Sequence, residues 1–157
     1  MKNKVLANKK IRQALSLAVD REKLITDVLD NTGEAAYTYT TKGIGIIGVS
    51  KDFSEEAGKI FPAYNPQKAK QLLAEGLKEL GLQKLPELTM IFNDSGNNKV
   101  ISEYIQESLR INLGVNINIE GMTFQSRLDK MQHRDYEIAL AGYNGDYKYF
   151  KILMEEL

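Results

Sequence analysis

The sequence of 157 residues contains no cysteine, three prolines and a single histidine. The lack of cysteine excludes disulfides, thiolate zinc sites and a cysteine nucleophile. No apolar run approaches the roughly 20 residues that a membrane-spanning helix needs. Neither sign of charge dominates, because 21 basic and 21 acidic residues cancel. We therefore expect no nucleic-acid partner and no attraction to an anionic lipid surface.

The length fits one domain with its own core, so we treat residues 1–157 as a single domain. The composition, 43% hydrophobic and 27% charged, is ordinary for a globular protein. The first residues, "MKNKVLANKK", have no apolar stretch behind their lysines and do not form a signal peptide. The chain is thus expected to be either a cytoplasmic protein or a piece of a longer one.

Helical spacing is clear in two parts of the first half. Asn8 and Asp20 are predicted to cap two consecutive helices, and Asn65 followed by Pro66 predicts the start of a third that Gly81 ends. Between them, residues 34–62 show no period and predict a long ordered loop with a short strand. Loops of this length in compact domains are often functional.

The second half alternates strands and helices. Residues 87–92, 115–120 and 136–141 predict strands, and the second alternates apolar and polar residues as an edge strand does. Helices are predicted between them, one closed by Gly114 and one capped by Thr123, with a last helix over 148–157. This order predicts an α/β fold with a central, mostly parallel sheet flanked by helices.

Signals of enzyme chemistry are weak. His133 falls at the end of a predicted helix, which favours a solvated histidine at a helix C-terminus. The glycines of "GIGIIG" (43–48) follow no clear strand and open no helix, so they do not predict a phosphate-binding loop. The acids at 52, 55 and 56 lack the spacing of a calcium loop, and the basic residues at 9, 10 and 12 predict a solvated helix face. We expect no metal, no cofactor and no catalysis.

The residues that follow the third predicted strand are better candidates for a ligand-binding site. Ligands of open parallel sheets bind beyond the carboxyl ends of the strands, where Gly142, Tyr143, Asn144, Gly145 and Asp146 follow residues 136–141. The glycines would let another backbone approach, and an extended ligand could pair with the main chain. Asp146 could then accept hydrogen bonds from an ammonium group. It is equally well placed to cap the helix predicted after it, and both roles stay open.

Three motifs in order resemble the oligopeptide-binding proteins of ABC peptide importers, which are extracellular solute-binding proteins of family 5. They are "LANKKIRQALSLAVDREKLITDVLDNTGEAA", "YNPQKAKQLLAEGL" and "IQESLRINLGVNINIEGMTFQSRLDKMQHRDYEIALAGYNGDY". The last matches the family's helix, "LGV", strand, helix and "G-W-x-x-D-Y" pattern. The similarity runs from about Leu6 to Tyr147.

The resemblance implies one lobe of a two-lobed, periplasmic-binding-protein-like fold, and specifically part of the C-terminal lobe. The missing partners would be the N-terminal lobe, a peptide ligand and the ABC transporter permease that receives the peptide. The place would be the periplasm or, for a lipoprotein of a Gram-positive bacterium, the cell surface. Carried over by position, Asp146 would accept the peptide's α-amine, and Gly142, Tyr143, Asn144 and Gly145 would supply backbone contacts, with Tyr143 as a wall.

The sequence also departs from the family pattern. Tyr143 stands where tryptophan is common, and Leu140 replaces a basic residue that can meet a ligand carboxylate. The change at Leu140 puts in doubt a clamp on the C-terminus of short peptides. The resemblance also leaves a dipeptide, a nickel complex or an oligosaccharide as alternative ligands, since members of the family take these. Two readings from other classes also remain: a small cytoplasmic α/β enzyme using His133 and Asp146, and an interaction domain using residues 34–62.

Overall fold

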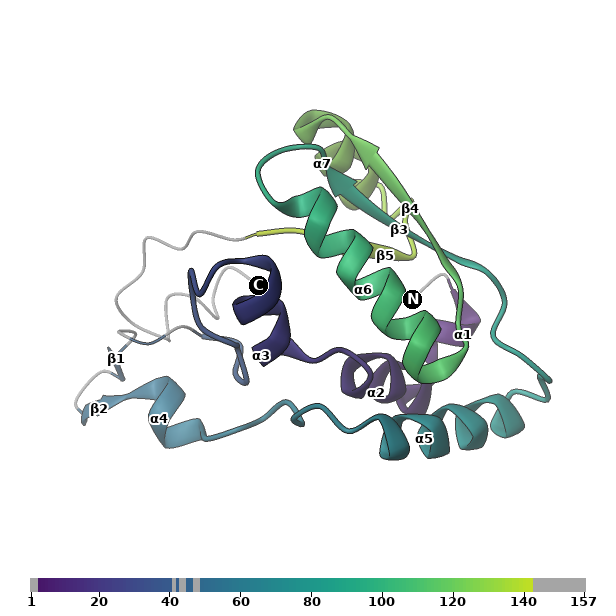
Figure 1. Ribbon diagram of the computed structural model, residues 1–157, viewed down its shortest axis with the longest axis horizontal. Helices are drawn as coiled ribbons and strands as arrows, with labels where there is room; N and C mark the ends of the chain where they lie inside the picture. Colours follow the sequence, from purple (N-terminus) through teal and green to yellow (C-terminus); the bar gives the residue numbers. More distant parts are fainter. Residues whose placement is uncertain (1–2, 41, 43–44, 47–48, 143–157) are drawn as a thin grey trace.

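The computed structural model describes residues 3–40, 42, 45–46 and 49–142 (Figure 1). Its helices and strands are, in chain order, α1 (Lys4–Ala7), α2 (Lys9–Leu17), α3 (Arg21–Lys23), the π-helix η1 (Leu24–Val28), β1 (Gly45–Ile46), β2 (Val49–Asp52), α4 (Phe53–Ala57), α5 (Pro66–Glu79), β3 (Leu88–Asn93), α6 (Asn98–Leu113), β4 (Ile117–Met122), α7 (Phe124–Gln132) and β5 (Ile138–Leu140). None of these described helices is long and apolar enough to cross a membrane. The helix predicted over 148–157 lies outside the described residues.

The main sheet has three strands in the order β4-β3-β5. β3 pairs in parallel with both neighbours, from Leu88 opposite Ile117 to Asn93 opposite Met122 on one side. On the other side Met90 lies opposite Ile138 and Phe92 opposite Leu140. The parallel sheet predicted from the alternation of strands and helices is confirmed, and so is the edge position of β4. A separate antiparallel hairpin joins β1 and β2.

Alternate residues of β3 face different layers, because side chains along a strand point to opposite faces. Leu88 and Met90 join the main core with Leu109 of α6, whereas Asn93 contacts α7. In Figure 1, α6 crosses the front of the sheet, α7 lies at its top, and α5 runs along the bottom beneath α2. The hairpin and α4 form an arm at the left, away from the sheet.

The predicted helix starts are confirmed by hydrogen bonds at the caps. The side chains of Asn8, Asn65 and Thr123 accept from backbone N–H groups in the first turns of α2, α5 and α7. Gly114 closes α6 in the left-handed conformation, with φ of 67°, as its position predicted. Each of these signals acts within four residues, so tertiary packing does not need to support it.

Two segments differ from the prediction. Asp20 caps α3 as expected, but after three residues the hydrogen bonds widen to the π pattern of η1, with Leu29 N donating to Leu24 O. Over a single turn, the spacing of apolar residues does not distinguish the hydrogen bonding of an α-helix from that of a π-helix. Within residues 34–62, the helix α4 was not predicted. Asp52, which was interpreted as a surface acid, caps α4 by accepting from Ser54 N at 2.8 Å.

The amino edge of the sheet is fastened by Glu137, which directly precedes β5. One carboxylate oxygen accepts from Thr89 N at 2.8 Å, and the other accepts from the Asn3 side chain. Asn3 in turn caps α1 by accepting from Val5 N and Leu6 N. The carboxylate therefore links the first helix to the sheet through hydrogen bonds to its charged form, which are stronger than neutral ones.

The closest helix contact joins α2 and α5 at Gly76. A Cβ atom built on Gly76 would lie 2.8 Å from Ile11 Cδ1 and 2.9 Å from Ile11 Cγ1. Ile11 is fully buried, so its side chain has no free space to move into. Glycine is required here by packing, because overpacked cores force side chains and backbone out of position.

We predict that Gly76→Ala lowers the free energy of unfolding by about 1–2 kcal/mol, although alanine forms helices better than glycine by about 1 kcal/mol. Urea unfolding measures this. Ala74→Gly, an exposed change on the same helix, calibrates helix propensity alone. Adding Ile11→Val removes the clashing Cδ1, so the double variant should lose less than the sum of the single changes. Strict additivity would contradict the packing explanation.

Lys10 links the same two helices on their solvent side. Its Nζ lies 2.8 Å from both Glu75 Oε2 and Glu79 Oε1. Hydrogen bonds to Lys10 hold the pKa of both carboxyl groups below the usual value, and those carboxylates raise the pKa of Lys10. Asn8 adds a hydrogen bond of 2.8 Å to Glu79. The basic residues at 9, 10 and 12 were expected to form a solvated helix face. Lys10 instead links α2 to α5, although at an exposed position.

Because the folded-state pKa values of Glu75 and Glu79 are depressed, their contribution to stability is present above the ordinary glutamate pKa of 4.5 and is lost as the pH falls through the lower folded values. The raised pKa of Lys10 keeps the bridge intact throughout the neutral range. We predict that Lys10→Met makes the loss of stability below about pH 5 shallower. Melting temperatures measured from pH 7 to pH 3 check this, with the exposed Lys9→Met as the control. Equal slopes for both variants would contradict it.

Candidate functional site

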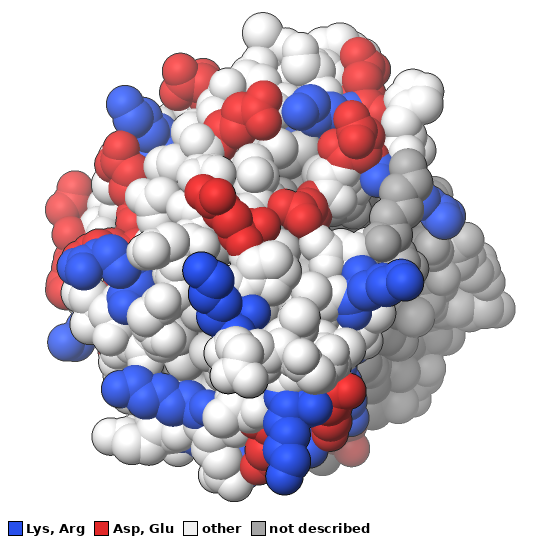
Figure 2. Space-filling view, turned by 90° about the vertical axis from the view of Figure 1, so that its right-hand side faces the viewer, with Lys and Arg blue, Asp and Glu red and all other residues white. Residues whose placement is uncertain are grey.

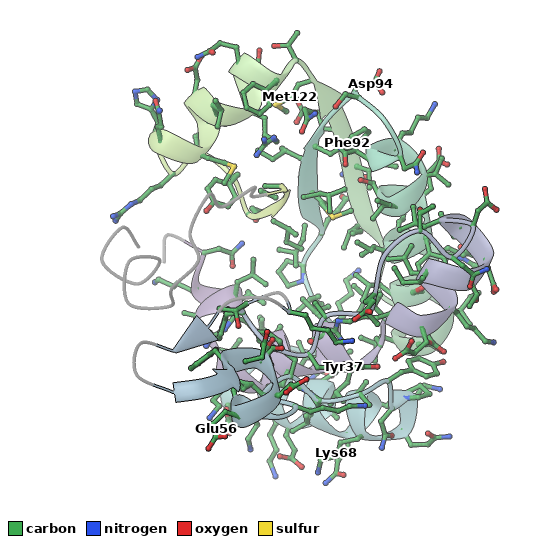
Figure 3. The ribbon with its side chains drawn as sticks, turned by 90° about the vertical axis from the view of Figure 1, so that its left-hand side faces the viewer. Tyr37, Glu56, Lys68, Phe92, Asp94 and Met122 are labelled. Carbon is green, nitrogen blue, oxygen red and sulfur yellow. The ribbon has the colours of Figure 1, made fainter. Side chains whose placement is uncertain are left out.

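The carboxyl ends of β3, β4 and β5 meet at one edge of the sheet, which we call the carboxyl edge. Asn93 ends β3 opposite Met122, and Asp94 N donates to Met122 O at 2.8 Å, which extends the pairing one step further. Leu140 ends β5 opposite Phe92. Figure 3 places Phe92, Asp94 and Met122 together at this end, far from Tyr37, Glu56 and Lys68. In open α/β sheets this edge is where ligands bind.

Asn93 organises the carboxyl edge. It is 8% exposed, its Oδ1 accepts from Arg127 Nε at 3.0 Å, and its amide nitrogen donates to Ser95 Oγ. Its backbone carbonyl oxygen accepts from the Asn98 side chain at 3.1 Å. The side-chain amide of Asn93 thus ties the end of β3 to the following turn and to α7, and its backbone carbonyl ties it to α6, so the edge has a defined shape before any ligand arrives.

Arg127 projects from α7 beneath this edge and is 3% exposed. Besides Asn93, its guanidinium contacts Met131 Sδ at 3.0 Å from Nη1 and lies 5.2 Å from the centre of the Phe124 ring. Nothing in the motifs singled this residue out. The available signal was a cation in the first turn and a half of a helix, where the helix dipole disfavours positive charge.

Of the five predicted site residues, Gly142 is described. It is exposed, lies two residues beyond the end of β5, and a Cβ atom built on it would meet no atom of the described residues within 4 Å. No described residue would therefore block the approach of another backbone at Gly142. Tyr143, Asn144, Gly145 and Asp146 lie outside the described residues, so both roles of Asp146, amine acceptor and helix cap, stay predictions.

His133 is the exposed C-cap of α7, and its Nδ1 lies 2.8 Å from Asp129 O. Its prediction as a histidine at a helix end is confirmed. α7 starts where β4 ends and finishes before β5 begins, so His133 lies toward the amino edge, a nine-residue helix away from Thr123. That length is about 13 Å. The geometry therefore separates His133 from Gly142. No acidic and histidine cluster able to hold a metal occurs within the described residues.

The long loop contains a hollow of its own. A cavity of about 640 Å³ lies between residues 34–42 and the end of α4. Thr40 lines it and has a buried hydroxyl without a hydrogen-bond partner, while Tyr39, also at the cavity, is 76% exposed and packs edge-on against Phe61. These features suit a surface that another part of a protein covers.

Charge is mixed over the surface. On the face shown in Figure 2, basic and acidic side chains are interspersed. This agrees with the formal net charge of zero and shows no single-sign field on that face.

Comparison with known proteins decides the family. The model of the bacterial extracellular solute-binding proteins, family 5, middle region, matches residues 1–154. The chain belongs to this family. The resemblance drawn from the three motifs is therefore confirmed, and the family 5 proteins are solute-binding proteins.

Two curated relatives illustrate the match. The chain is 35% identical over 145 residues to the dipeptide-binding protein of Lactococcus lactis subsp. cremoris, covering 92% of this chain and 26% of that protein. It is 30% identical over 150 residues to the oligopeptide-binding protein OppA of Bacillus subtilis, with the same two shares of 92% and 26%. The chain thus spans about a quarter of the length of these curated relatives.

Solved structures confirm the fold. Listeria monocytogenes OppA bound to peptide matches with a TM-score of 0.85 and 32% identity, over 93% of this chain and 29% of that one. The predicted class, a mostly parallel sheet flanked by helices in a lobe of a two-lobed binding protein, agrees with the described sheet and with this neighbour.

We predict that Asn93→Ala lowers the free energy of unfolding by about 1–3 kcal/mol, because it leaves the buried Arg127 Nε and the Ser95 hydroxyl without their acceptor and donor. Thermal or urea unfolding measures the loss. Asn118→Ala, an exposed change on β4, is the matched control and should stay within about 0.5 kcal/mol of the parent. Equal effects of the two variants would show that Asn93 does not organise the carboxyl edge.

Proposed function

We propose that this chain is part of the C-terminal lobe of a protein that captures extended peptides and delivers them to an ABC transporter permease. The observation that carries the proposal is the carboxyl edge, where the strands end together and no described atom crowds Gly142, in a chain of family 5. Support comes from the similar fold of Listeria monocytogenes OppA, whose structure is bound to peptide. The protein performs no chemistry in this proposal.

The binding mode follows from the strand end. Backbone groups of Gly142, Tyr143, Asn144 and Gly145 pair with the peptide main chain, which reads no side chains and so accepts many sequences. Asp146 accepts hydrogen bonds from the α-ammonium group of the peptide. A carboxylate and an ammonium that meet away from water form strong charge-assisted bonds, and leaving either one unpaired there costs several kcal/mol.

The partners in this proposal are the peptide, the N-terminal lobe of the same protein and the permease. The lobes close around the peptide by a hinge movement, and the closed form docks on the permease. The loop at 34–62, with its exposed Tyr39, packs against the rest of the protein. The protein works outside the cytoplasm, in a periplasm or as a lipoprotein at the cell surface.

A second candidate ligand is a dipeptide. It is favoured by the 35% identity to the dipeptide-binding protein of Lactococcus lactis. In this proposal the dipeptide and the longer peptide both place their amine at Asp146. The two ligands therefore differ only in whether the site has room beyond the first two ligand residues.

Calorimetric titration of the complete protein with alanine peptides of about two to six residues tests the function and separates the two ligands. We predict binding of peptides with a free N-terminus and a loss of about 10- to 100-fold in affinity when that terminus is acetylated. In Asp146→Asn this preference for the free amine should largely disappear.

Asp135→Asn is the matched control for that variant. Asp135 is an exposed acid between α7 and β5, toward the amino edge, and its change removes the same charge. Its preference for the free amine should equal that of the parent. An unchanged ratio in Asp146→Asn would refute the role of Asp146, and no binding of any peptide would refute the function.

A further inference from the structure

The strand β5 is apolar throughout, but it is the outermost strand on one side of the described sheet. Its residues are Ile138, Ala139 and Leu140, and continuous apolar strands are typical of parallel sheets that are covered on both faces. β4, the outermost strand on the other side, differs, because exposed residues alternate with more buried ones from Ile117 to Glu120. β5 thus has the pattern of an interior strand, although the described residues give it a partner strand on one side only.

A mostly apolar cavity of about 590 Å³ lies beside β5, between the sheet, α2 and α6. Its apolar lining includes Leu15, Met90, Ile105, Leu109, Ile117 and Ile138. Leu15, Ile105 and Ile138 are only half-buried, and Tyr136, which lines the same cavity, is 40% exposed. Apolar side chains that stay open beside an unpaired strand mark a surface that another segment covers.

The source of the covering segment follows from chain length. The chain spans 26% of each of two curated relatives, so a protein of their length has much further chain available. β3 pairs in parallel with both neighbours, and a further parallel strand beside β5 would continue the same sheet. Such a strand needs a crossover of about a dozen residues and about five residues of its own. Residues 143–157 are too few to supply both.

We infer that a strand from a part of the same protein outside this chain pairs in parallel with the open side of β5, and that apolar side chains of the segment carrying this strand fill the cavity. The inference goes beyond the proposed function, because it concerns the assembly of the lobe and holds for any ligand. It has a consequence for the site, since a partner strand on each side of β5 would fix the strand that leads to Gly142.

Photochemical cross-linking of the complete protein identifies the partner. Tyr136 is replaced by the photoreactive residue p-benzoyl-phenylalanine, a change between aromatic side chains at a partly exposed position. After irradiation and digestion, mass spectrometry should find Tyr136 joined to a segment of the same polypeptide outside residues 1–157. The same replacement at Ala74, an exposed residue of α5, is the control and should give no cross-link to that segment.

Thiol accessibility measures whether the cavity is covered. The chain has no cysteine, so an introduced thiol reports on its own position once the rate of the parent protein is subtracted. In the native complete protein, Tyr136→Cys should react with a maleimide at least about 10-fold more slowly than Ala74→Cys. In concentrated urea the two rates should be equal, because the covering segment is then removed.

Hydrogen exchange tests the strand itself. Alternate N–H groups of a strand point to opposite sides, so an outermost strand leaves alternate amides without a partner strand. In the complete protein all the amides of Ile138–Leu140 should exchange slowly, measured residue by residue with mass spectrometry. Fast exchange at alternate positions of β5 would refute the partner strand.

The remaining outcomes separate this inference from its rivals and from the proposed function. Cross-links that double the mass on a denaturing gel would show that a second copy covers β5, and cross-links only to residues 143–157 would show that this chain covers itself. Either result overturns the inference, as do equal maleimide rates in the native protein. Peptide binding is measured separately: a protein that binds peptides but leaves Tyr136 open refutes this inference alone. A protein that protects Tyr136 but binds no peptide refutes the function alone.

Discussion

The parallel pairing of β3 with both of its neighbours is the constraint on which the structure depends. Parallel strands need long crossover connections, so α6 and α7 must lie on the faces of the sheet, and every strand must end at the same edge. That arrangement divides the sheet into two different edges. Glu137 and Asn3 close the amino edge with hydrogen bonds, whereas at the carboxyl edge no described atom would lie within 4 Å of a Cβ atom built on Gly142.

The parts of the fold that the sequence predicts are those determined within a few residues. Asn8, Asn65 and Thr123 each accept hydrogen bonds from the turn that follows, so their identity alone locates a helix start. The π-helix after Asp20 could not be predicted in this way. η1 packs against α6, and Tyr104 of α6 donates at 3.0 Å to Asp20 O, the cap just before this segment, across 84 positions of the chain. A contact of that range leaves no local pattern.

The residues of the candidate site also fall into those with a local sequence signal and those without one. Gly142 was predicted because glycine after an apolar strand is a local signal, and the family pattern added the roles predicted for its neighbours. Arg127 and Asn93 were missed, because each is unremarkable beside its own chain neighbours. Their significance comes from meeting 34 positions apart, where a strand end and a helix start are brought together by the crossover. Such a pair becomes visible only once the sheet order is known.

In the proposed binding mode, charge and main-chain pairing have complementary tasks at the carboxyl edge. Hydrogen bonds to a peptide backbone are the same for every residue, so they give affinity without choosing a sequence. The charged amine of a peptide is equally independent of sequence, but it fixes the direction and the register of the peptide. With Asp146 as the acceptor of that amine, the proposed site would therefore hold many different peptides in one orientation.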